Sequence, residues 1–252
     1  MSDITLVIGD AHVDPKQAKA NKGLERFTWA NKYIHDIKPD RVVIIGDFFT
    51  MDSVSSHNNG KFLTKENLRY SLDLMAGEAG LQLLDVPKNT ELIFTEGNHE
   101  ERSRRYLEGV PELEGTLPTP EDVTRGVYPD VKWVPYKEFH TYRGVGFTHV
   151  PFNEGGKPVA GKTATARALD LCDTSVVFGH THKLDVACVH RHGGRHLVQA
   201  INVGCFFAHV DDYALGTVTS YWRGLVTLNH YDHGRVDVET LALGRLRREY
   251  GK

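Results

Sequence analysis

Three short apolar runs in the first hundred residues each lead into a glycine that is followed by Asp or Asn. The runs are Ile4–Ile8, Arg41–Ile45 and Glu91–Phe94, and the motifs that follow them are GDAH, GDFF and GNHE. Apolar residues at helical spacing fill the stretches 19–37 and 64–85 between them, and 100–108 continues as a short charged helix. Buried strands that alternate with helices are typical of βαβ units. The pattern therefore predicts an α/β fold with a largely parallel sheet.

The second half of the chain has a different pattern. Residues 109–130 are rich in Pro and Gly and predict a surface excursion, placed where it could cover a site. Further strands are expected at Val145–Val150 and Val176–Phe178. From about residue 184 the runs HLVQAINVG, ALGTVTSYW and GLVTLNHYD alternate and are split by glycines, as antiparallel strands do. We expect one domain over residues 1–252, in which the C-terminal part forms a second, more antiparallel sheet.

Composition excludes several classes of protein. The 252-residue chain has 30 Lys and Arg against 33 Asp and Glu, so it lacks the strongly basic surface of a general nucleic-acid binder. Its three cysteines form no CxxC pair, which favours reduced residues in a cytoplasmic protein. The N-terminus lacks the pattern of a signal peptide, and no apolar stretch reaches membrane-spanning length. A chain of this size folds without a structural metal, so any metal is expected to serve chemistry.

Polar motifs follow five of the predicted strands. They are GDAH (9–12), GDFF (46–49), GNHE (97–100), a lone histidine in FTHV (147–150) and GHTH (179–182). Ligands of open α/β sheets lie just beyond the carboxyl ends of the strands, so these motifs are expected to share one crevice. The candidate metal ligands are Asp10, His12, Asp47, Asn98, His149, His180 and His182.

These residue types indicate the chemistry of the crevice. Carboxylates and imidazoles without a thiolate suit divalent ions such as Mn, Fe, Zn or Ni. Two Asp, one Asn and four His are too many ligands for one tetrahedral ion with an open position, but they suit two ions bridged by a carboxylate. Two ions about 3.5–4 Å apart can hold a hydroxide between them and clamp phosphoryl oxygens. The pattern therefore predicts hydrolysis of a phosphate ester.

The five motifs in this order resemble the calcineurin-like metallophosphoesterase family over residues 9–182. The resemblance implies a two-sheet β-sandwich flanked by helices, in four α/β/β/α layers. It also implies two divalent metal ions, of which manganese is the first choice and Fe, Zn, Ni or Mg are alternatives. The stretch GNHEERSRRYL is in addition similar to phosphoesterases encoded by bacteriophages.

The resemblance also implies a role for each motif residue. Asp10, His12 and His182 are expected to bind the first ion, and Asn98, His149 and His180 the second, with Asp47 as the bridge. His99 is expected to be catalytic together with Asp47, contacting the phosphate and protonating the leaving oxygen. The predicted substrate-binding residues are Asn98, His99 and Arg102. Arg102 follows His99 by three residues, and a guanidinium suits a phosphate, although a solvated charged helix is the simpler interpretation.

The substrate class is open between several alternatives. A phosphodiesterase acting on nucleic acid or nucleotides is favoured, and a phosphomonoesterase or protein phosphatase is the alternative. The second motif reads GDFFTMD and lacks the arginine of the GDxVDRG motif of Ser/Thr protein phosphatases, which puts that activity in doubt. A non-catalytic scaffold of this family would lack ligands, and none is missing. The substrate is thus expected to be a phosphoester, with no membrane as partner.

Residues 156–163, GKPVAGKT, match the phosphate-binding pattern GxxxxGK[ST], so a P-loop NTPase is a further alternative. Six residues separate His149 from the first glycine, whereas a P-loop follows its strand at once. Pro158 also removes one of the amides that would bind phosphate. We therefore expect 153–163 to be a flexible loop near the site, or a plain linker.

Overall fold

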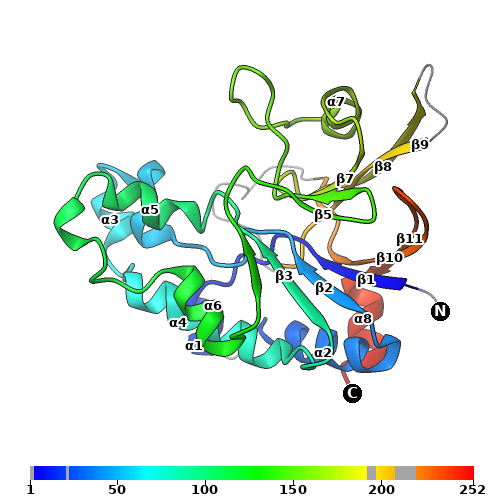
Figure 1. Cartoon of the computed structure of the whole chain (residues 1–252). Helices are drawn as coiled ribbons and strands as arrows, with labels where there is room; N and C mark the ends of the chain where they lie inside the picture. The colour runs from blue at the N-terminus through cyan, green and yellow to red at the C-terminus, as the bar shows by residue number, and fades with distance from the viewer. Residues whose placement is uncertain (1–2, 21–22, 192–196, 208–219) are drawn as a thin grey trace.

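The computed structural model describes residues 3–20, 23–191, 197–207 and 220–252. Two β-sheets lie face to face, with most helices on the outer face of the first sheet and one helix, α7, on the outer face of the second (Figure 1). This is the predicted α/β fold with two sheets between helical layers. No helix within the described residues is long and apolar enough to cross a membrane.

The first sheet has six strands in the order β11-β10-β1-β2-β3-β4. Their bounds are β1 Asp3–Ile8, β2 Arg41–Ile44, β3 Glu91–Thr95, β4 Lys132–Val134, β10 Gly224–Asp232 and β11 Arg235–Ala242. Strands β1 to β4 are parallel, whereas β10 pairs antiparallel with both β1 and β11. The carboxyl ends of β1, β2 and β3 therefore lie at one edge of the sheet.

The second sheet has five strands in the order β5-β6-β7-β9-β8. Their bounds are β5 His140–Tyr142, β6 Val145–Phe147, β7 Ser175–Phe178, β8 Leu184–His190 and β9 Leu197–Val203. Strands β6, β7 and β9 are parallel, so their carboxyl ends also share an edge. The two edges meet where the chain after β9 runs beside the chain after β1, since Phe206 N donates to Asp10 O at 2.7 Å.

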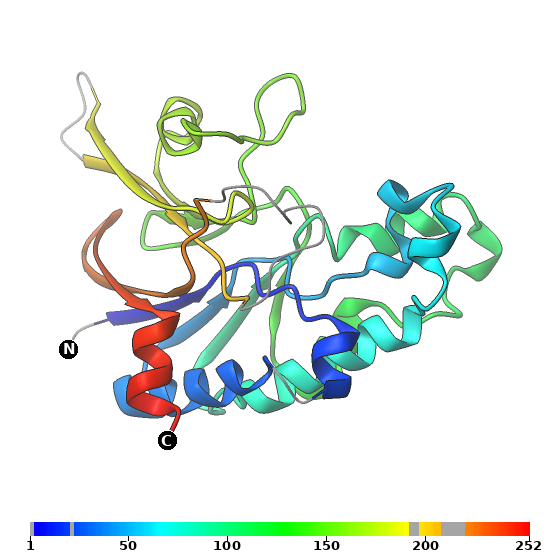
Figure 2. The same ribbon diagram turned by 180° about the vertical axis from the view of Figure 1, so that it is seen from behind.

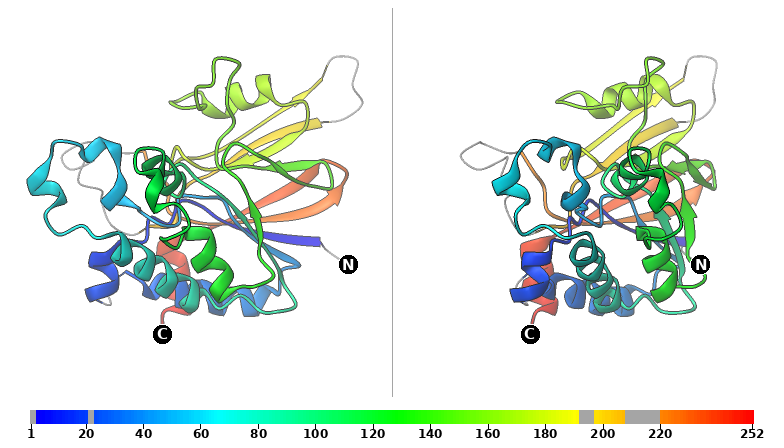
Figure 3. Two further views of the ribbon diagram at one scale, coloured as in Figure 1. Left: turned by 60° about the vertical axis from the view of Figure 1, so that its left-hand side comes forward. Right: turned by 90° about the vertical axis from the view of Figure 1, so that its left-hand side faces the viewer.

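Helices cover the outer faces of both sheets. The α-helices are α1 Pro15–Ala20, α2 Glu25–Ile37, α3 Phe62–Lys65, α4 Tyr70–Leu84, α5 Glu101–Leu107, α6 Pro120–Val127, α7 Ala164–Leu171 and α8 Leu243–Tyr250. The described residues also include the short 3₁₀ helices η1 Asp52–Val54, η2 Ser56–Asn58 and η3 Pro111–Leu113. Seen from behind, α8 stands beside α2 against the first sheet (Figure 2). The chain around α3 and α5 projects as a separate lobe (Figure 3).

Strand β1 shows why its sequence is a continuous apolar run. Leu6 and Ile8 belong to the core between the first sheet and the helices, while Val7 belongs to the core between the two sheets. Side chains alternate across a strand, so a strand buried on both faces needs apolar residues at every position. A third core joins the second sheet to α7 through residues such as Phe178 and Ala168.

Two predicted helices are each divided in the structure. The helix predicted over 19–37 is α1 and α2, and Gly23, at φ 95°, lies between them. The helix predicted over 64–85 is α3 and α4, separated by residues 66–69. The prediction of one helix in each place was wrong because apolar spacing continues across a break in the backbone.

The surface excursion predicted at 109–130 contains a helix, α6, that packs against α4. Its start has a capping box, in which Thr119 Oγ1 accepts from Asp122 N at 3.1 Å and Asp122 Oδ2 accepts from Thr119 N at 2.8 Å. Tyr128 fixes the end, since its hydroxyl donates to Leu81 O at 2.7 Å. This segment is therefore part of the helical layer.

The C-terminal strands divide between the sheets. β8 and β9 form an antiparallel pair in the second sheet, as predicted, but β10 and β11 extend the first sheet. The prediction of a second sheet from the whole C-terminal part was wrong for β10 because that strand fills the open edge of β1. The strand predicted over 214–222 falls largely outside the described residues.

Candidate metal centre

The five motif segments come together at the edge where the two sheets meet. β1, β2 and β3 deliver GDAH, GDFF and GNHE, and β6 and β7 deliver His149 and GHTH. Backbone bonds hold neighbouring segments together: Ala11 N and His12 N donate to Asp47 O at 3.0 and 2.9 Å, and Gly179 N donates to His149 O at 2.9 Å. The motif segments that were expected to meet at the strand ends therefore lie side by side in the folded chain.

Four candidate ligands have a left-handed backbone. The φ angles are 41° at His12, 48° at Asp47, 67° at His180 and 59° at His182. This region is unfavourable for residues with a Cβ, and such residues concentrate at functional sites. The strain indicates that these turns are held by the surrounding fold in order to direct side chains inward.

One cluster of ligand atoms combines Asp10, His12 and His182, all of which are buried. His182 Nε2 lies 3.0 Å from Asp10 Oδ2 and 3.2 Å from His12 Nε2. Asp10 Oδ1 accepts from His180 N at 3.1 Å, whereas the buried Oδ2 forms no hydrogen bond within the described residues despite the close approach of His182 Nε2. A buried carboxylate oxygen without a donor is costly unless a cation binds it.

A second cluster combines Asp47, His149 and His180. His149 Nε2 lies 3.4 Å from Asp47 Oδ2 and 3.3 Å from His180 Nδ1. Asn98 joins this cluster, since its Oδ1 lies 3.1 Å from His149 Nε2. Asp47 also belongs to a third group with His12 and His99, so its carboxylate lies between the two clusters.

The contacts inside both clusters fit bound cations. Nitrogen and oxygen ligands about 2.0–2.2 Å from a metal ion stand roughly 3–3.5 Å from one another. His149 Nδ1 donates to Ile45 O at 2.9 Å, which leaves Nε2 to face the other ligand atoms. Metal-binding histidines are usually oriented by such a bond from the second ring nitrogen. The donor set is carboxylate, imidazole and amide, which suits first-row divalent ions.

Titration of these groups follows from burial and from their mutual charges. Burial alone would raise the pKa of Asp47, but the charges of His149 and His99 hold that pKa well below its ordinary value. Burial lowers the pKa of His180 to about 4, and the charge of His149 acts in the same direction. His180 thus keeps a lone pair at neutral pH. Burial lowers the pKa of His149, but the Asp47 carboxylate raises it by more, so a cation bound there displaces a proton.

His99 is oriented by two neighbours. Its Nδ1–H donates to Thr50 O at 2.8 Å, and its Nε2 accepts from Arg102 Nη2 at 2.9 Å. His99 Nε2 also lies 3.8 Å from Asp47 Oδ2. Burial lowers the pKa of His99, Asp47 raises it and the Arg102 charge lowers it again. The imidazole therefore faces the centre in a defined orientation.

Arg102 is engaged within the protein. Besides His99, its guanidinium contacts Thr50 O at 2.7 Å and Asp52 Oδ1 at 2.8 Å through Nη1. The Arg102 side chain is 12% exposed and that of Asp52 is 47% exposed. Arg102 thus lies beside His99, and its charge is shared with Asp52.

Two residues that the sequence did not indicate support the ligands. Buried Glu100 accepts from Asp47 N and Gly97 N, each at 2.9 Å, and from Phe49 N at 2.8 Å. Burial and the Asp47 charge raise the pKa of Glu100, and the backbone donors offset part of that cost. Buried Arg26 donates to Ala11 O at 2.9 Å, between Asp10 and His12. Glu100 ends GNHE and could have been noticed there, whereas Arg26 belongs to no motif.

Two motif glycines lie so close to candidate ligands that a side chain would not fit at either position. A Cβ at Gly97 would lie 2.3 Å from both the amide nitrogen and Oδ1 of Asp47. A Cβ at Gly179 would lie 2.3 Å from Asp10 Oδ1. A side chain at either position would displace a candidate ligand.

A comparison with protein families decides the family of the chain. The model of the calcineurin-like phosphoesterase family matches residues 5–184, more than half of the chain. The chain belongs to this family. It is accordingly a metal-dependent phosphoester hydrolase, and the family binds a dinuclear divalent metal centre.

Two solved structures are similar at low identity to the calcineurin-like phosphoesterase described here. The chain is similar to the nuclease MPE of Pseudomonas putida, with 13% identity, coverage of 93% of this chain and 87% of that one, and a TM-score of 0.41. It is also similar to Vps29 of Chaetomium thermophilum, with 11% identity, coverage of 94% and 96%, and a TM-score of 0.36. No curated protein sequence matches the chain.

The loop GKPVAGKT lacks the backbone arrangement of a P-loop. Gly156 N donates to Asn153 O at 2.9 Å, and Val159 N donates to Pro151 O at 2.9 Å. Lys157 N donates to Asn153 Oδ1 at 3.0 Å. These amides are used within the loop and its neighbours instead of converging on a phosphate.

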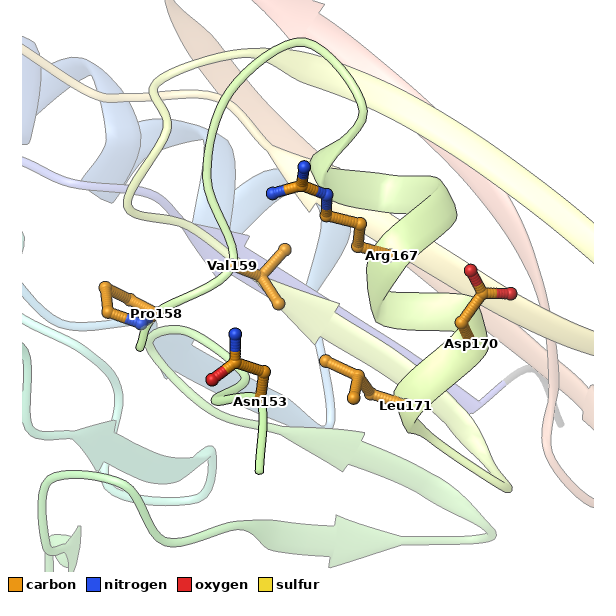
Figure 4. Close-up of a pocket in the computed structure, with 6 residues that line it drawn as sticks. All are labelled: Asn153, Pro158, Val159, Arg167, Asp170 and Leu171. Carbon is orange, nitrogen blue, oxygen red and sulfur yellow. The ribbon is translucent and has the colours of Figure 1, made fainter. Parts of the chain in front are cut away.

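Part of the same loop lines a shallow pocket against α7 (Figure 4). The pocket has a volume of about 340 Å³ and is lined by Asn153, Pro158, Val159, Arg167, Asp170 and Leu171. None of the candidate metal ligands contributes to this lining. The loop is therefore associated with α7, and the metal centre lies elsewhere.

Proposed function

We propose that this chain is a dinuclear metallophosphodiesterase that acts on nucleic acid or nucleotides, as a single domain over residues 1–252. Manganese is the proposed metal, because the ligand set contains no thiolate. Asp10, His12 and His182 would hold one ion, Asn98, His149 and His180 the other, and Asp47 would contact both. The ions, when bound, supply a nucleophile derived from water and neutralise charge on the phosphoryl oxygens.

The remaining residues of the proposed site position the substrate. His99 is assigned to the phosphate and the leaving oxygen, because Thr50 O fixes its Nδ1–H and directs Nε2 towards Asp47. Asn98 is assigned to the metal and to the substrate, since its amide oxygen lies among the ligands of the second cluster. Glu100 acts through the backbone of Asp47 and Gly97 and is a positioning residue.

The observation that carries the preference for diesters is the Arg102–Asp52 ion pair. A phosphomonoester is largely a dianion at neutral pH, whereas a diester carries one negative charge, so a monoesterase gains from an additional free cation. Here the Arg102 guanidinium contacts Asp52 Oδ1 at 2.8 Å and Thr50 O at 2.7 Å. The pairing favours a singly charged phosphate over a dianion. The missing arginine in GDFFTMD argues in the same direction against a protein phosphatase.

An assay of metal-stripped protein resupplied with Mn tests the proposal. The substrates are bis-p-nitrophenyl phosphate, p-nitrophenyl phosphate, single- and double-stranded DNA, and cyclic nucleotides. We expect kcat/KM for the bis ester to exceed that for the monoester by about tenfold, equivalent to about 1.4 kcal/mol of transition-state stabilisation. EDTA should abolish both activities.

Two variants separate this proposal from the P-loop alternative. Asp47→Asn should lower phosphodiesterase activity by at least about a hundredfold, since it removes a charge shared by both clusters. Lys162→Ala should leave the phosphodiesterase activity unchanged. Neither the unchanged protein nor Lys162→Ala should hydrolyse ATP. Faster hydrolysis of the monoester than of the bis ester would reject the diesterase assignment, and ATP hydrolysis lost in Lys162→Ala would favour the NTPase.

A further inference from the structure

The lobe that contains α3 holds two large apolar side chains outside any core. Phe62 is 85% exposed and Leu63 is 86% exposed. Among the described residues these are the two most exposed large hydrophobic side chains. Burial of such a side chain typically stabilises a protein by about 1.5–3 kcal/mol, so the fold gains nothing from placing these two in water.

Positive charge surrounds this apolar pair. Lys61 precedes Phe62, and Lys65 follows it by three residues, about one helical turn. Arg69 ends the segment, and Glu66 is the only acidic residue between positions 57 and 69. No ion pair with a carboxylate is found for these three cations within the described part of the chain; Lys65 Nζ donates to the amide oxygen of Asn59, and Arg69 Nη1 donates to the backbone oxygens of Glu66 and Leu68. We call Lys61, Phe62, Leu63, Lys65 and Arg69 the α3 patch.

The α3 patch is attached to the rim of the metal centre. In the same segment, Asp52 of η1 holds Arg102, which in turn contacts His99 Nε2 at 2.9 Å. Asp73 of α4 holds η1 in place, since its Oδ2 accepts from Ser53 N at 3.0 Å and from Ser53 Oγ at 2.6 Å. α5 packs against η1, and α3 packs against η2. The α3 patch and the metal centre are therefore connected through η1 and η2.

We propose that the α3 patch binds single-stranded nucleic acid next to the scissile phosphate, with a base on Phe62 and phosphates on Lys61, Lys65 and Arg69. This inference rests on the proposed function and adds a site for the flanking nucleotides. Sites for single strands combine aromatic side chains, on which bases stack, with cations along the backbone. The patch supplies both in one exposed segment, although the whole chain carries a net charge of −3. The cations are complementary to phosphate, and the exposed Phe62 ring beside them favours a strand with bases over an acidic peptide.

Binding without catalysis tests the patch directly. Fluorescence anisotropy of labelled oligothymidylate of about 20 nucleotides is measured with the full chain in EDTA, between about 50 and 200 mM salt. We expect Phe62→Ala/Leu63→Ala to weaken binding by about five- to a hundredfold, the range for losing one stacked base. We expect Lys61→Glu/Lys65→Glu to weaken binding and to reduce the slope of log Kd against log salt by about 1–2.

Matched controls lie away from the lobe. Tyr231→Ala removes another aromatic side chain, 56% exposed, and Arg248→Glu reverses another charge on a side chain that is 74% exposed. Both should bind oligothymidylate as the unchanged protein does. With Mn, all four variants should hydrolyse bis-p-nitrophenyl phosphate at the unchanged rate, while the two α3-patch variants should show a raised KM on single-stranded DNA.

Unchanged oligothymidylate binding by both α3-patch variants would overturn this inference. The inference would also be overturned if the α3-patch variants lost binding to vesicles of phosphatidylcholine and phosphatidylserine but kept binding to oligothymidylate. That result would identify the patch as a membrane contact. The proposed function fails in a different way, through absence of hydrolysis of bis-p-nitrophenyl phosphate by the unchanged protein. The anisotropy measurement does not depend on hydrolysis, so it would still test the α3 patch after that result.

Discussion

At the residue scale, the charge on the rim of the centre depends on one ion pair. Arg102 is the cation that lies against His99, and Asp52 accepts from it at 2.8 Å. The Asp52 side chain is 47% exposed, so solvent screens this pair and limits its energy. The pair nevertheless decides how much positive charge Arg102 offers to a phosphate.

Removal of the Asp52 charge should shift the preference of the enzyme towards monoesters. In Asp52→Asn the guanidinium keeps a hydrogen-bond partner but is no longer neutralised. We expect the ratio of kcat/KM for p-nitrophenyl phosphate to that for bis-p-nitrophenyl phosphate to rise about two- to fivefold, as an exposed pair of about 0.5–1 kcal/mol allows. Steady-state kinetics with Mn measure this ratio.

Asp130→Asn is the matched control, because Asp130 is exposed and lies in the turn before β4. The ratio should not change in that variant. A ratio that stays constant or falls in Asp52→Asn would show that the ion pair does not set the preference between diesters and monoesters.

The sequence predicted which residues would meet at the centre but not what holds them there. Asp10, Asp47 and His180 each follow a buried strand and a glycine, so their positions follow from local patterns and from the rule for parallel sheets. The role of Glu100 depends on amides from two motifs about fifty residues apart in sequence, and no local pattern encodes that contact. Buried Arg26 is concealed for the same reason.

At the element scale, α6 shows how a short helix is stabilised in a segment rich in turn residues. Thr119 and Asp122 exchange bonds across the first turn, and Pro120 occupies a position where a missing N–H costs nothing. The helix then packs on α4, the helix whose Asp73 fixes the lobe of the α3 patch. The stability of α6 therefore contributes to the stability of the fold and not to the reaction at the metal centre.

Loss of this cap should lower stability without changing activity per folded molecule. Thr119→Ala removes the acceptor for Asp122 N, which typically costs about 1 kcal/mol. For a chain of this size that corresponds to a fall in Tm of roughly 2–4 °C, measured by calorimetry. Ser71→Ala, at an exposed position early in α4, is the control and should leave Tm unchanged or slightly higher. A fall in Ser71→Ala as large as that in Thr119→Ala would argue against the cap.

Helix boundaries were less predictable than helix existence. The helix predicted over 64–85 is preceded in the structure by the start of α3 at Phe62, and neither Phe62 nor Leu63 is buried. Periodicity alone cannot separate an apolar residue that packs inward from one that faces solvent. The predicted helix began at residue 64, so the sequence analysis assigned this pair to no helix, and the structure places both side chains at the surface.

At the scale of the whole molecule, the metal centre exists because two sheets bring their carboxyl ends to one place. The first sheet supplies Asp10, Asp47 and Asn98, and the second supplies His149 and His180. The two-sheet architecture was predictable from the resemblance and the strand pattern. The addition of β10 and β11 to the first sheet was not, because strand pairing across two hundred residues leaves no local trace in sequence.

The central claim is that two clusters, linked by Asp47, each hold a divalent ion. The most direct test is an anomalous difference map from crystals of the protein grown with Mn. The account predicts two peaks about 3.5–4 Å apart, one among Asp10, His12 and His182 and the other among Asn98, His149 and His180, with Asp47 between them. Asp47→Asn crystals should lose occupancy at one or both peaks. Crystals of active protein with no peak at these residues, or with one ion bound elsewhere, would contradict it.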